Sequence, residues 1–375
     1  MGSLASAVLA LLTVPAASTA GQCQAISSPV AFVYVSSSGD GGSRINAFAA
    51  AVNGTLTVVP GMPILANVQN MALNGKWLFG TDSVNIYTFS IASSGALAPR
   101  SSINAQQFNG YTDGGPVKLF LDHTGATLYD EDIYGNNGAN NTFQFFSIDS
   151  ATGNLSYMGA TSSASPDFLL LSFIGNNIYA YGSSCYLSSP YIYGFSRGSG
   201  GTLTDLNLAP SIPSFPNGGY CPYLAAADPA NHVAVSLTPT DGFNPVGPAQ
   251  LAVYTANSAG TLSTASTYKN MPKVLVGEVT YLNMAPSGKL LAVAGTSGLQ
   301  VFHFNGANPI THYTGLLTTD AVSQMFWDNA NHLYAISQNA GKLYVFTVTG
   351  MTATPAPGSP HAITAPQNII VLPKS

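Results

Sequence analysis

The stretch Phe143-Gln144-Phe145-Phe146-Ser147-Ile148-Asp149-Ser150-Ala151-Thr152-Gly153-Asn154-Leu155 contains the pattern that decides the fold. It begins with an apolar-x-x-aromatic tetrad, and after a short polar segment it continues as Gly-x-Leu. Glycine readily adopts the positive φ that tight hairpin turns require, and the leucine restarts an inward-facing strand. The stretch therefore predicts two antiparallel strands joined by a tight turn.

The same pattern recurs along the whole chain. Seven tetrads lie about 50 residues apart: Ile45–Phe48, Ile86–Phe89, Phe143–Phe146, Ile192–Phe195, Leu251–Tyr254, Leu299–Phe302 and Leu343–Phe346. Five of them are followed by Gly-x-Leu: Gly54–Leu56, Gly95–Leu97, Gly153–Leu155, Gly201–Leu203 and Gly260–Leu262. Self-similarity at a fixed period of this length is typical of a repeat architecture.

A second hairpin precedes each later tetrad, so that one repeat contains four short strands, named a, b, c and d in chain order. A four-stranded sheet repeated at this spacing matches a propeller blade, which buries its faces by stacking on its neighbours. Residues 31–59 supply strands b, c and d only, and Gln367–Leu372 reads as a lone strand a. We therefore predict an all-β, seven-bladed β-propeller of four-stranded antiparallel blades, closed by the C-terminal strand completing the first blade. A β-sandwich is the competing fold, but it would not give a pattern that recurs seven times at a fixed spacing.

Composition supports one repetitive domain with almost no helix. Only 7% of the 375 residues are charged, whereas Gly is abundant at 38 residues. Surface helices need many exposed Lys, Glu and Arg residues, and this chain has only ten Lys and Arg residues together. The net charge of −5 and the absence of Lys/Arg clusters interleaved with aromatics argue against nucleic acid as a partner.

The N-terminus predicts export. Leu4 to Ala17 is apolar, and small residues precede Gly21, as signal peptidase requires. The apolar run is shorter than the roughly 20 residues of a membrane span, so we expect no transmembrane segment. We divide the chain into a signal peptide (1–20), a lead-in (21–30) and the propeller (31–375), and expect a secreted or periplasmic protein.

Met1-Gly2-Ser3 lacks the Lys or Arg that usually begins a signal peptide. This leaves open whether the start of the signal peptide has been shortened. A lipid anchor on Cys23 is disfavoured, because no small residue of a lipoprotein signal directly precedes it.

Four motifs carry a resemblance to a known family. They are Phe146-Ser147-Ile148-Asp149, Thr152-Gly153-Asn154-Leu155, Pro286-Ser287-Gly288-Lys289 and Gly358-Ser359-Pro360-His361. With the Leu-Tyr strands, they resemble the seven-bladed lactonase family, similar to propeller-type 6-phosphogluconolactonases and their exported relatives. The resemblance implies a hydrolase of a lactone or sugar-derived ester. The alternative is a noncatalytic exported binding or cell-surface propeller, because these motifs mark the scaffold and fold alone does not decide function.

The d-to-a and b-to-c connections emerge on one face and include the longer loops, so a ligand site is expected there, at the mouth of the central channel. Lactone hydrolysis needs a base to activate water and donors to stabilise the oxyanion. The residues expected to be catalytic are Glu131, Glu278, His361 and Lys118. Those expected to bind substrate are Asp113, Asp130, Asp132, Lys273, Asp320 and Arg44, and Asp167 is a further possible base.

Each of these residues also has a structural interpretation. Asp130-Glu131-Asp132 fits a solvated loop or a cation site, and Glu278 and Lys118 fit structural salt bridges. His361 fits an inert loop residue, and the other five histidines fit turns or strands.

Cys185 and Cys221 are expected on the same face of adjacent blades, where a disulfide is compatible with export. We expect no metal, no cofactor, a small-molecule or carbohydrate-derived ligand, and a monomer.

Overall fold

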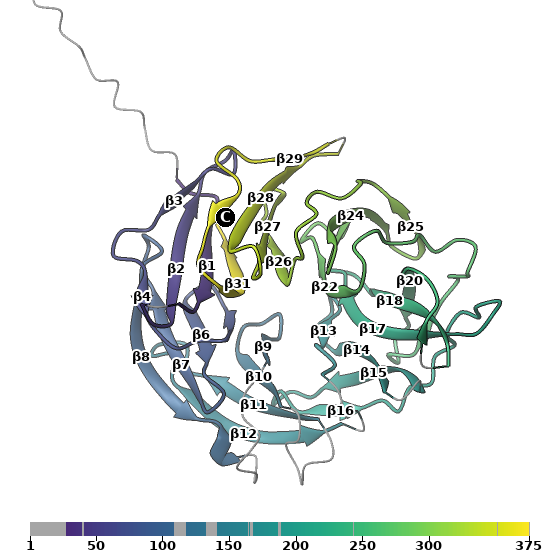
Figure 1. Ribbon diagram of the computed structural model, residues 1–375. Coiled ribbons are helices and arrows are strands. Elements are labelled where there is room, and N and C mark those ends of the chain that lie inside the picture. The colour runs from purple at the N-terminus through teal and green to yellow at the C-terminus, as the bar shows by residue number, and fades with distance from the viewer. Residues whose placement is uncertain are drawn as a thin grey trace, which may run out of the picture.

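The computed structural model describes residues 28–39, 41–108, 118–132, 141–163, 165, 168–186, 189–242, 244–350 and 352–374. The predicted signal peptide, Cys23 and most of the lead-in lie outside this part of the chain. Within it, seven antiparallel sheets stand around a ring (Figure 1). The predicted all-β, seven-bladed propeller is therefore confirmed.

Each blade contains four strands in the order a, b, c, d from the channel outward. Blade 1 has β31 (Pro366–Pro373), β1 (Ala31–Ser37), β2 (Arg44–Ala50) and β3 (Leu56–Val58). Blade 2 has β5 (Asn70–Leu73), β6 (Trp77–Thr81), β7 (Asn85–Ile91) and β8 (Leu97–Asn104). Blade 3 has β9 (Lys118–Leu121), β10 (Thr127–Asp132), β11 (Thr142–Ile148) and β12 (Leu155–Ser162). Blade 4 has β13 (Ser172–Phe173), β14 (Tyr179–Tyr186), β15 (Ser189–Arg197) and β16 (Leu203–Asp205).

The other three blades repeat this order. Blade 5 has β17 (Gly219–Ala227), β18 (His232–Asp241), β20 (Gln250–Ala256) and β21 (Leu262–Ser263). Blade 6 has β22 (Val279–Met284), β23 (Leu290–Gly295), β24 (Gly298–Asn305) and β25 (Asn308–His312). Blade 7 has β26 (Gln324–Trp327), β27 (His332–Ser337), β28 (Lys342–Val348) and β29 (Ala353–Pro355). Three further two-residue strands pair with strands of these blades: β4 (Ile64–Leu65) with β2, β19 (Asn244–Pro245) with β18, and β30 (His361–Ala362) with β28.

The ring closes through its C-terminal strand, as predicted. β31 pairs antiparallel with β1, with Ala31 opposite Pro373 and Val35 opposite Ile369. Figure 1 shows the yellow β31 beside the purple β1. Because strand a of the first blade comes from the far end of the chain, the ring has no open radial edge that another chain could extend.

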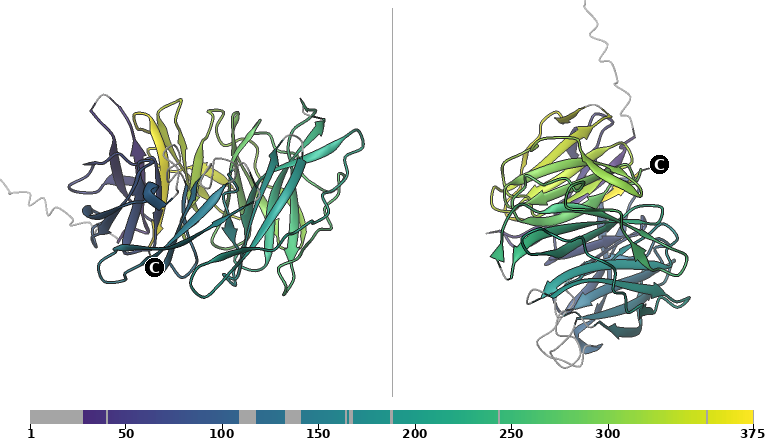
Figure 2. Two further views of the ribbon diagram at one scale, coloured as in Figure 1. Left: turned by 90° about the horizontal axis from the view of Figure 1, so that it is seen from below. Right: turned by 90° about the vertical axis from the view of Figure 1, so that its right-hand side faces the viewer.

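Helix is nearly absent from the described residues, where the only helical segment is the 3-10 turn η1 (Gln106–Phe108). Seen from the side, the ring is a disc with strands running across its thickness (Figure 2). We call the face that carries the b-to-c and d-to-a connections the upper face, and the face with the a-to-b and c-to-d turns the lower face. No described helix has the length and apolar character of a membrane span.

The core lies between neighbouring blades. Between blades 7 and 1, for example, Tyr334 and Ile336 of β27 pack in one cluster with Val33 and Val35 of β1. Val33, Val35, Tyr334 and Ile336 are fully buried. A single blade would leave such a face in water, so each blade is stable only against the next.

Hydroxyl groups on one blade bind the c-to-d turn of the following blade. The hydroxyl groups of Tyr34, Tyr129 and Tyr181, all on strands b, donate to the carbonyl oxygens of Gly95, Gly201 and Gly260 at 2.9, 2.6 and 2.8 Å, respectively. In blade 2 the donor is Thr88 Oγ1 on strand c, 3.1 Å from Gly153 O. The four acceptors are glycines of the repeated Gly-x-Leu motif. That motif therefore marks the blade-to-blade contact as well as the turn.

Only glycine fits at these turns, for two separate reasons. Gly95 has a φ of +86°, which is unfavourable for any residue with a Cβ. A Cβ at Gly95 would also lie 2.4 Å from the Phe32 ring of blade 1. Gly61 has a similar φ of +82°, but a Cβ there would meet no atom within 4 Å.

This pair of glycines separates backbone strain from loss of blade packing. We expect Gly61→Ala to lower the free energy of unfolding by about 1 kcal/mol, which is the cost of a left-handed alanine. Gly95→Ala should cost about 1–3 kcal/mol more, because Phe32 must move and the blade 1–blade 2 contact opens. Urea unfolding followed by tryptophan fluorescence measures both values. Equal effects of the two substitutions would show that the turn does not depend on blade contact.

Candidate functional site

A polar cavity of about 290 Å³ lies at the upper end of the central channel. It is lined by strands a, or residues next to them, from blades 1, 2, 3, 4, 6 and 7. A second cavity of about 170 Å³ shares Leu170, Leu171 and Tyr281 with it and continues down the channel beside blade 5. The polar side chains that the upper cavity offers include Asn70, Lys118, Tyr281, Gln324, Gln367 and Asn368. Of the described residues that line this cavity, only Lys118 carries a full charge at neutral pH.

Two carboxamide oxygens at this cavity lack a hydrogen-bond partner. Asn368 Oδ1 and Gln367 Oε1, both on β31, are buried, and no described group donates to them. The side chain of Gln324 is partly engaged, since its Oε1 accepts from Ile369 N at 2.8 Å. A buried acceptor without a donor is costly, so these two oxygens lack a donor that the described residues do not supply.

Lys118 begins β9 and its ammonium group is largely removed from solvent. Burial lowers the pKa of Lys118, and the nearby charge of Glu131 opposes that shift. Its Nζ lies 5.8 Å from the centre of the Phe168 ring. No described carboxylate forms an ion pair with Lys118. The structural salt bridge considered from the sequence is therefore not formed, and the ammonium group lies next to the cavity.

Glu131, directly opposite Lys118 in the β10–β9 pairing, does not line the cavity. Its side chain is fully buried and points to blade 4, where its carboxylate accepts from Leu169 N at 2.5 Å and Leu170 N at 2.9 Å. Asn141 Nδ2 donates a third hydrogen bond at 2.5 Å. Burial raises the pKa of Glu131 to about 7 in spite of these donors. This geometry suits a carboxylate that holds the segment before β13 in place, including Leu170 at a φ of +48°.

Asp130 and Asp132 lie on the other side of β10. The solvated loop considered for Asp130-Glu131-Asp132 is wrong, because all three residues belong to the strand and are fully buried. Side chains alternate along a strand, so Asp130 and Asp132 share a side with Leu128, which packs with Trp77 and Phe79 of blade 2. Burial raises the pKa of Asp132 to about 7. Runs of three acidic residues are typical of solvated turns, which is why the sequence alone favoured a loop here.

The remaining predicted residues lie away from the channel cavity. Arg44 begins β2 and its Nε lies 3.4 Å from Gly42 O. Asp320 is bound by Lys342 Nζ at 2.8 Å and by the Tyr344 hydroxyl, and these contacts lower the pKa of Asp320. Lys273 is exposed.

Glu278 and His361 are also separate from the channel. Glu278 is exposed and lines a different groove of about 370 Å³ with Tyr223 and Pro248. His361 lies on β30 with its ring centre 6.4 Å from that of Phe48, and burial lowers its pKa. Asp113 and Asp167 lie outside the described residues. Of the residues predicted to be catalytic, the structure therefore places only Lys118 at the cavity.

The amides that line the cavity were not predicted from the sequence. A weak signal for them exists: Gln69-Asn70 and Gln367-Asn368 are identical dipeptides at the start of two inner strands, β5 and β31. Equivalent positions of two repeats point in equivalent directions. The same polar pair at the start of two inner strands is therefore expected to face the central channel from both blades. Among the described residues, no group of three or more His, Cys, Asp or Glu side chains is arranged to hold a metal ion.

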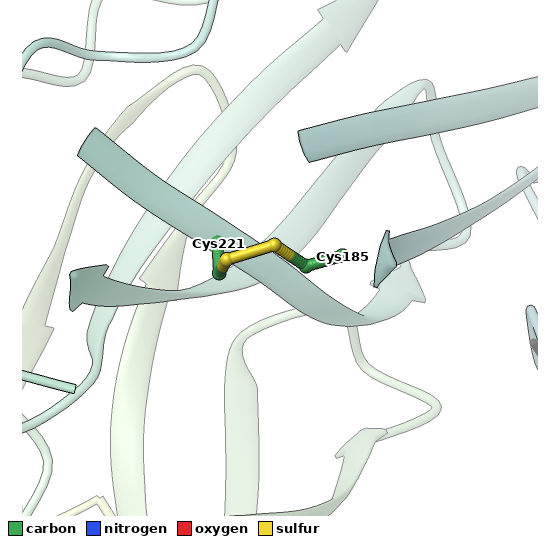
Figure 3. Close-up of a disulfide and its surroundings, with 2 residues drawn as sticks. All are labelled: Cys185 and Cys221. Atoms are coloured by element: carbon green, nitrogen blue, oxygen red, sulfur yellow. A yellow bond between two sulfur atoms is a disulfide. The ribbon is translucent and has the colours of Figure 1, made fainter. Parts of the chain in front are cut away.

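A disulfide joins blades 4 and 5 near the upper face. Cys185 of β14 and Cys221 of β17 are bonded, with a Cα–Cα distance of 5.2 Å (Figure 3). Both cysteines lie within strands, on the adjacent blades that the sequence predicted. The bond crosses a blade boundary, so it limits how far these two blades can separate.

We expect the Cys185→Ser/Cys221→Ser double variant to lose about 3–4 kcal/mol of unfolding free energy, because a loop of 36 residues is no longer closed in the unfolded chain. Guanidinium unfolding of the oxidised protein and of the variant measures this difference. Cys23→Ser is the matched control and should leave stability unchanged. An unchanged midpoint in the double variant, or two reactive thiols at these positions in the untreated protein, would contradict the bond.

The comparisons with known proteins match this architecture. A candidate 6-phosphogluconolactonase from Bacteroides uniformis superposes with a TM-score of 0.66 at 12% identity, covering 91% of this chain and 99% of that one. The periplasmic gluconolactonase of Pseudomonas aeruginosa gives a TM-score of 0.65 at 13% identity, with 91% and 99% covered. At such identities the likeness establishes the fold. The structural resemblance to 6-phosphogluconolactonase-like propellers, predicted from the motifs, is thus confirmed.

The same fold likeness extends to a protein with a different description. A hypothetical selenium-binding protein from Sulfolobus tokodaii superposes with a TM-score of 0.61 at 10% identity, covering 92% of this chain and 94% of that one. No protein-family model matches the chain. No curated protein matches it either. Proteins of this fold therefore differ in function, and the residues of the cavity determine the chemistry.

Proposed function

We propose that this chain is a lactone hydrolase that binds a polyhydroxylated sugar-acid lactone in the upper channel cavity. The observation that carries the proposal is the position of Lys118 as the one charged side chain among the described lining residues, with carboxamides beside it. The resemblance in fold to described lactonases supports the reaction class. The predicted leader supports action outside the cytoplasm, where a non-phosphorylated lactone is the expected substrate.

The roles follow from the chemistry of a lactone. Water attacks the carbonyl carbon, negative charge develops on the carbonyl oxygen, and the ring oxygen leaves with a proton to give a hydroxy acid. An ammonium group in a poorly solvated cavity stabilises that charge more strongly than it would in water. We assign this role to Lys118. The buried oxygens of Asn368 and Gln367 are suited to accept from the substrate hydroxyl groups.

Lys118→Met tests the role of the ammonium group. We expect kcat/KM to fall about 10²-fold on the best lactone of a panel of aldonolactones, because the oxyanion loses its cationic partner. A pH-stat assay measures the acid released. Lys273→Met is the matched control, since Lys273 is exposed and outside the cavity, and its activity should stay within about twofold of the wild type. Absence of turnover above buffer on every lactone would reject the hydrolase.

Asn368→Leu tests the recognition of hydroxyl groups. The substitution removes a carboxamide whose oxygen is unpaired, so protein stability should not fall, whereas KM for a polyhydroxylated lactone should rise about tenfold. KM for an unsubstituted lactone of the same ring size should change little. Equal changes for the two lactones would indicate a general disturbance of the cavity and would contradict hydroxyl recognition at Asn368.

A second function is a noncatalytic binding propeller that uses the same cavity. It is favoured by one observation: among the described residues no carboxylate lines the cavity, and Glu131 behind it is bound by three donors. Calorimetric titration with aldonates distinguishes the two. Binding that Lys118→Met abolishes, with no lactone turnover in the wild type, would establish the binding protein instead of the enzyme.

A further inference from the structure

Four buried oxygen-bearing side chains gather between blades 2 and 3, on the side of β10 that faces away from Glu131. Asp130 lies directly opposite Gln144 in the β10–β11 pairing, and Asp132 lies opposite Thr142. Directly opposed residues of an antiparallel pair have their Cβ atoms about 4.5–5.5 Å apart on the same side of the sheet. Asp130, Asp132 and Gln144 are 0% exposed and Thr142 is 4% exposed. The four side chains therefore form one polar cluster inside an otherwise apolar blade interface.

The buried carboxamide of Gln144 is the most unusual group of this cluster. Neither its Oε1 nor its Nε2 has a hydrogen-bond partner among the residues that the structure describes. Thr142 Oγ1 also lacks one. A carboxamide taken fully out of water with both ends unpaired is strongly unfavourable, and native proteins rarely keep one unless something else binds it. The cluster thus offers a carbonyl oxygen and a hydroxyl oxygen to a group other than a protein donor.

The charge of the cluster indicates what that group is. Asp130 and Asp132 place two carboxylates on the same side of one strand, and each makes further contacts with its surroundings. Carboxylate, carboxamide and hydroxyl oxygens together are the ligand set of a hard divalent cation.

We propose that Asp130, Asp132, Gln144 and Thr142 form a Ca²⁺ site between blades 2 and 3. Ca²⁺ accepts six to eight oxygen ligands in flexible geometry and combines carboxylates with neutral oxygens, whereas zinc prefers histidine and cysteine, which the cluster lacks. Two carboxylates would balance the charge of one divalent ion. Water would supply the remaining ligands.

The site has a structural consequence that does not rest on the proposed function. The cation would lie beside β10 on the side facing blade 2, while Glu131 on the other side of β10 binds the segment before β13 of blade 4. Ca²⁺ binding would thus stabilise the folded ring and hold the strand that lies next to Lys118. We expected no metal from the sequence, although Asp130-Glu131-Asp132 also fitted a cation site. The unpaired polar groups of Gln144 and Thr142 favour that alternative for Asp130 and Asp132.

The test uses the full chain after treatment with a chelator and dialysis. Calorimetric titration with CaCl₂ should show one site per chain, and saturating Ca²⁺ should raise Tm by about 2 °C or more, because the ion binds only the folded state. Asp132→Asn should weaken Ca²⁺ binding at least about tenfold, since one of two charged ligands is lost. Gln144→Leu should remove most of the Ca²⁺-dependent shift in Tm while leaving the Tm of the chelated protein unchanged or higher, because the unpaired carboxamide is gone.

Asp122→Asn is the matched control. Asp122 is a buried carboxylate of the same blade, but it pairs with Arg197 outside the cluster. This variant should be less stable and still respond to Ca²⁺ like the wild type. Absence of binding heat and of any Tm shift in the wild type up to about 10 mM Ca²⁺ would overturn the proposal, since even weak extracellular sites bind in the millimolar range. A Ca²⁺ response that survives both Asp132→Asn and Gln144→Leu would overturn it as well, because the ion would then bind elsewhere.

Discussion

The ring depends on the contact between one blade and the c-to-d turn of the next. At four of the blade boundaries a hydroxyl group donates to the backbone carbonyl of a glycine in that turn, as Tyr129 does at Gly201. The approach is possible because glycine has no Cβ: at Gly201 a Cβ would lie 2.7 Å from Thr127 of blade 3. Each such hydrogen bond contributes about 1 kcal/mol and, more importantly, sets the distance at which the apolar faces of two blades meet. The repeat in the sequence is thus a repeat of inter-blade contacts.

A ring built this way leaves its inner strands free to carry polar groups. The blades are held together from strand b outward, where Val33, Leu128 and Tyr334 are fully buried. Strands a line the channel, and their upper ends supply Asn70, Lys118, Gln324 and Asn368 to one cavity from four different blades. Because each side chain comes from a separate, well-packed sheet, the cavity is preformed. Preorganised groups are what both hydrolysis and tight binding of a small ligand require.

The sequence predicted the scaffold in detail but only one of the residues that line the cavity, and the reason is physical. All seven tetrads lie in strands c, and the lone C-terminal segment closes blade 1, because these features recur and each copy supports the others. Site residues occur once, so no period identifies them. Glu278 and His361 were chosen for their chemistry, but Glu278 lines another groove and His361 lies beside Phe48 of blade 1. The repeat places both Lys118 and Glu278 at a strand a, but only Lys118 lines the channel cavity.

β10 is the strand in which local sequence and fold disagree most. Three consecutive acidic residues have low strand propensity and a high cost of burial, yet Asp130, Glu131 and Asp132 are completely buried. The carboxylate on one side is stabilised by backbone donors of the neighbouring blade, and those on the other side lie opposite Gln144 and Thr142. Folded proteins keep such inconsistencies chiefly where binding or chemistry requires them. Since β10 is paired with the strand that carries Lys118, the most costly polar groups of this blade lie one strand away from the cation that lines the cavity.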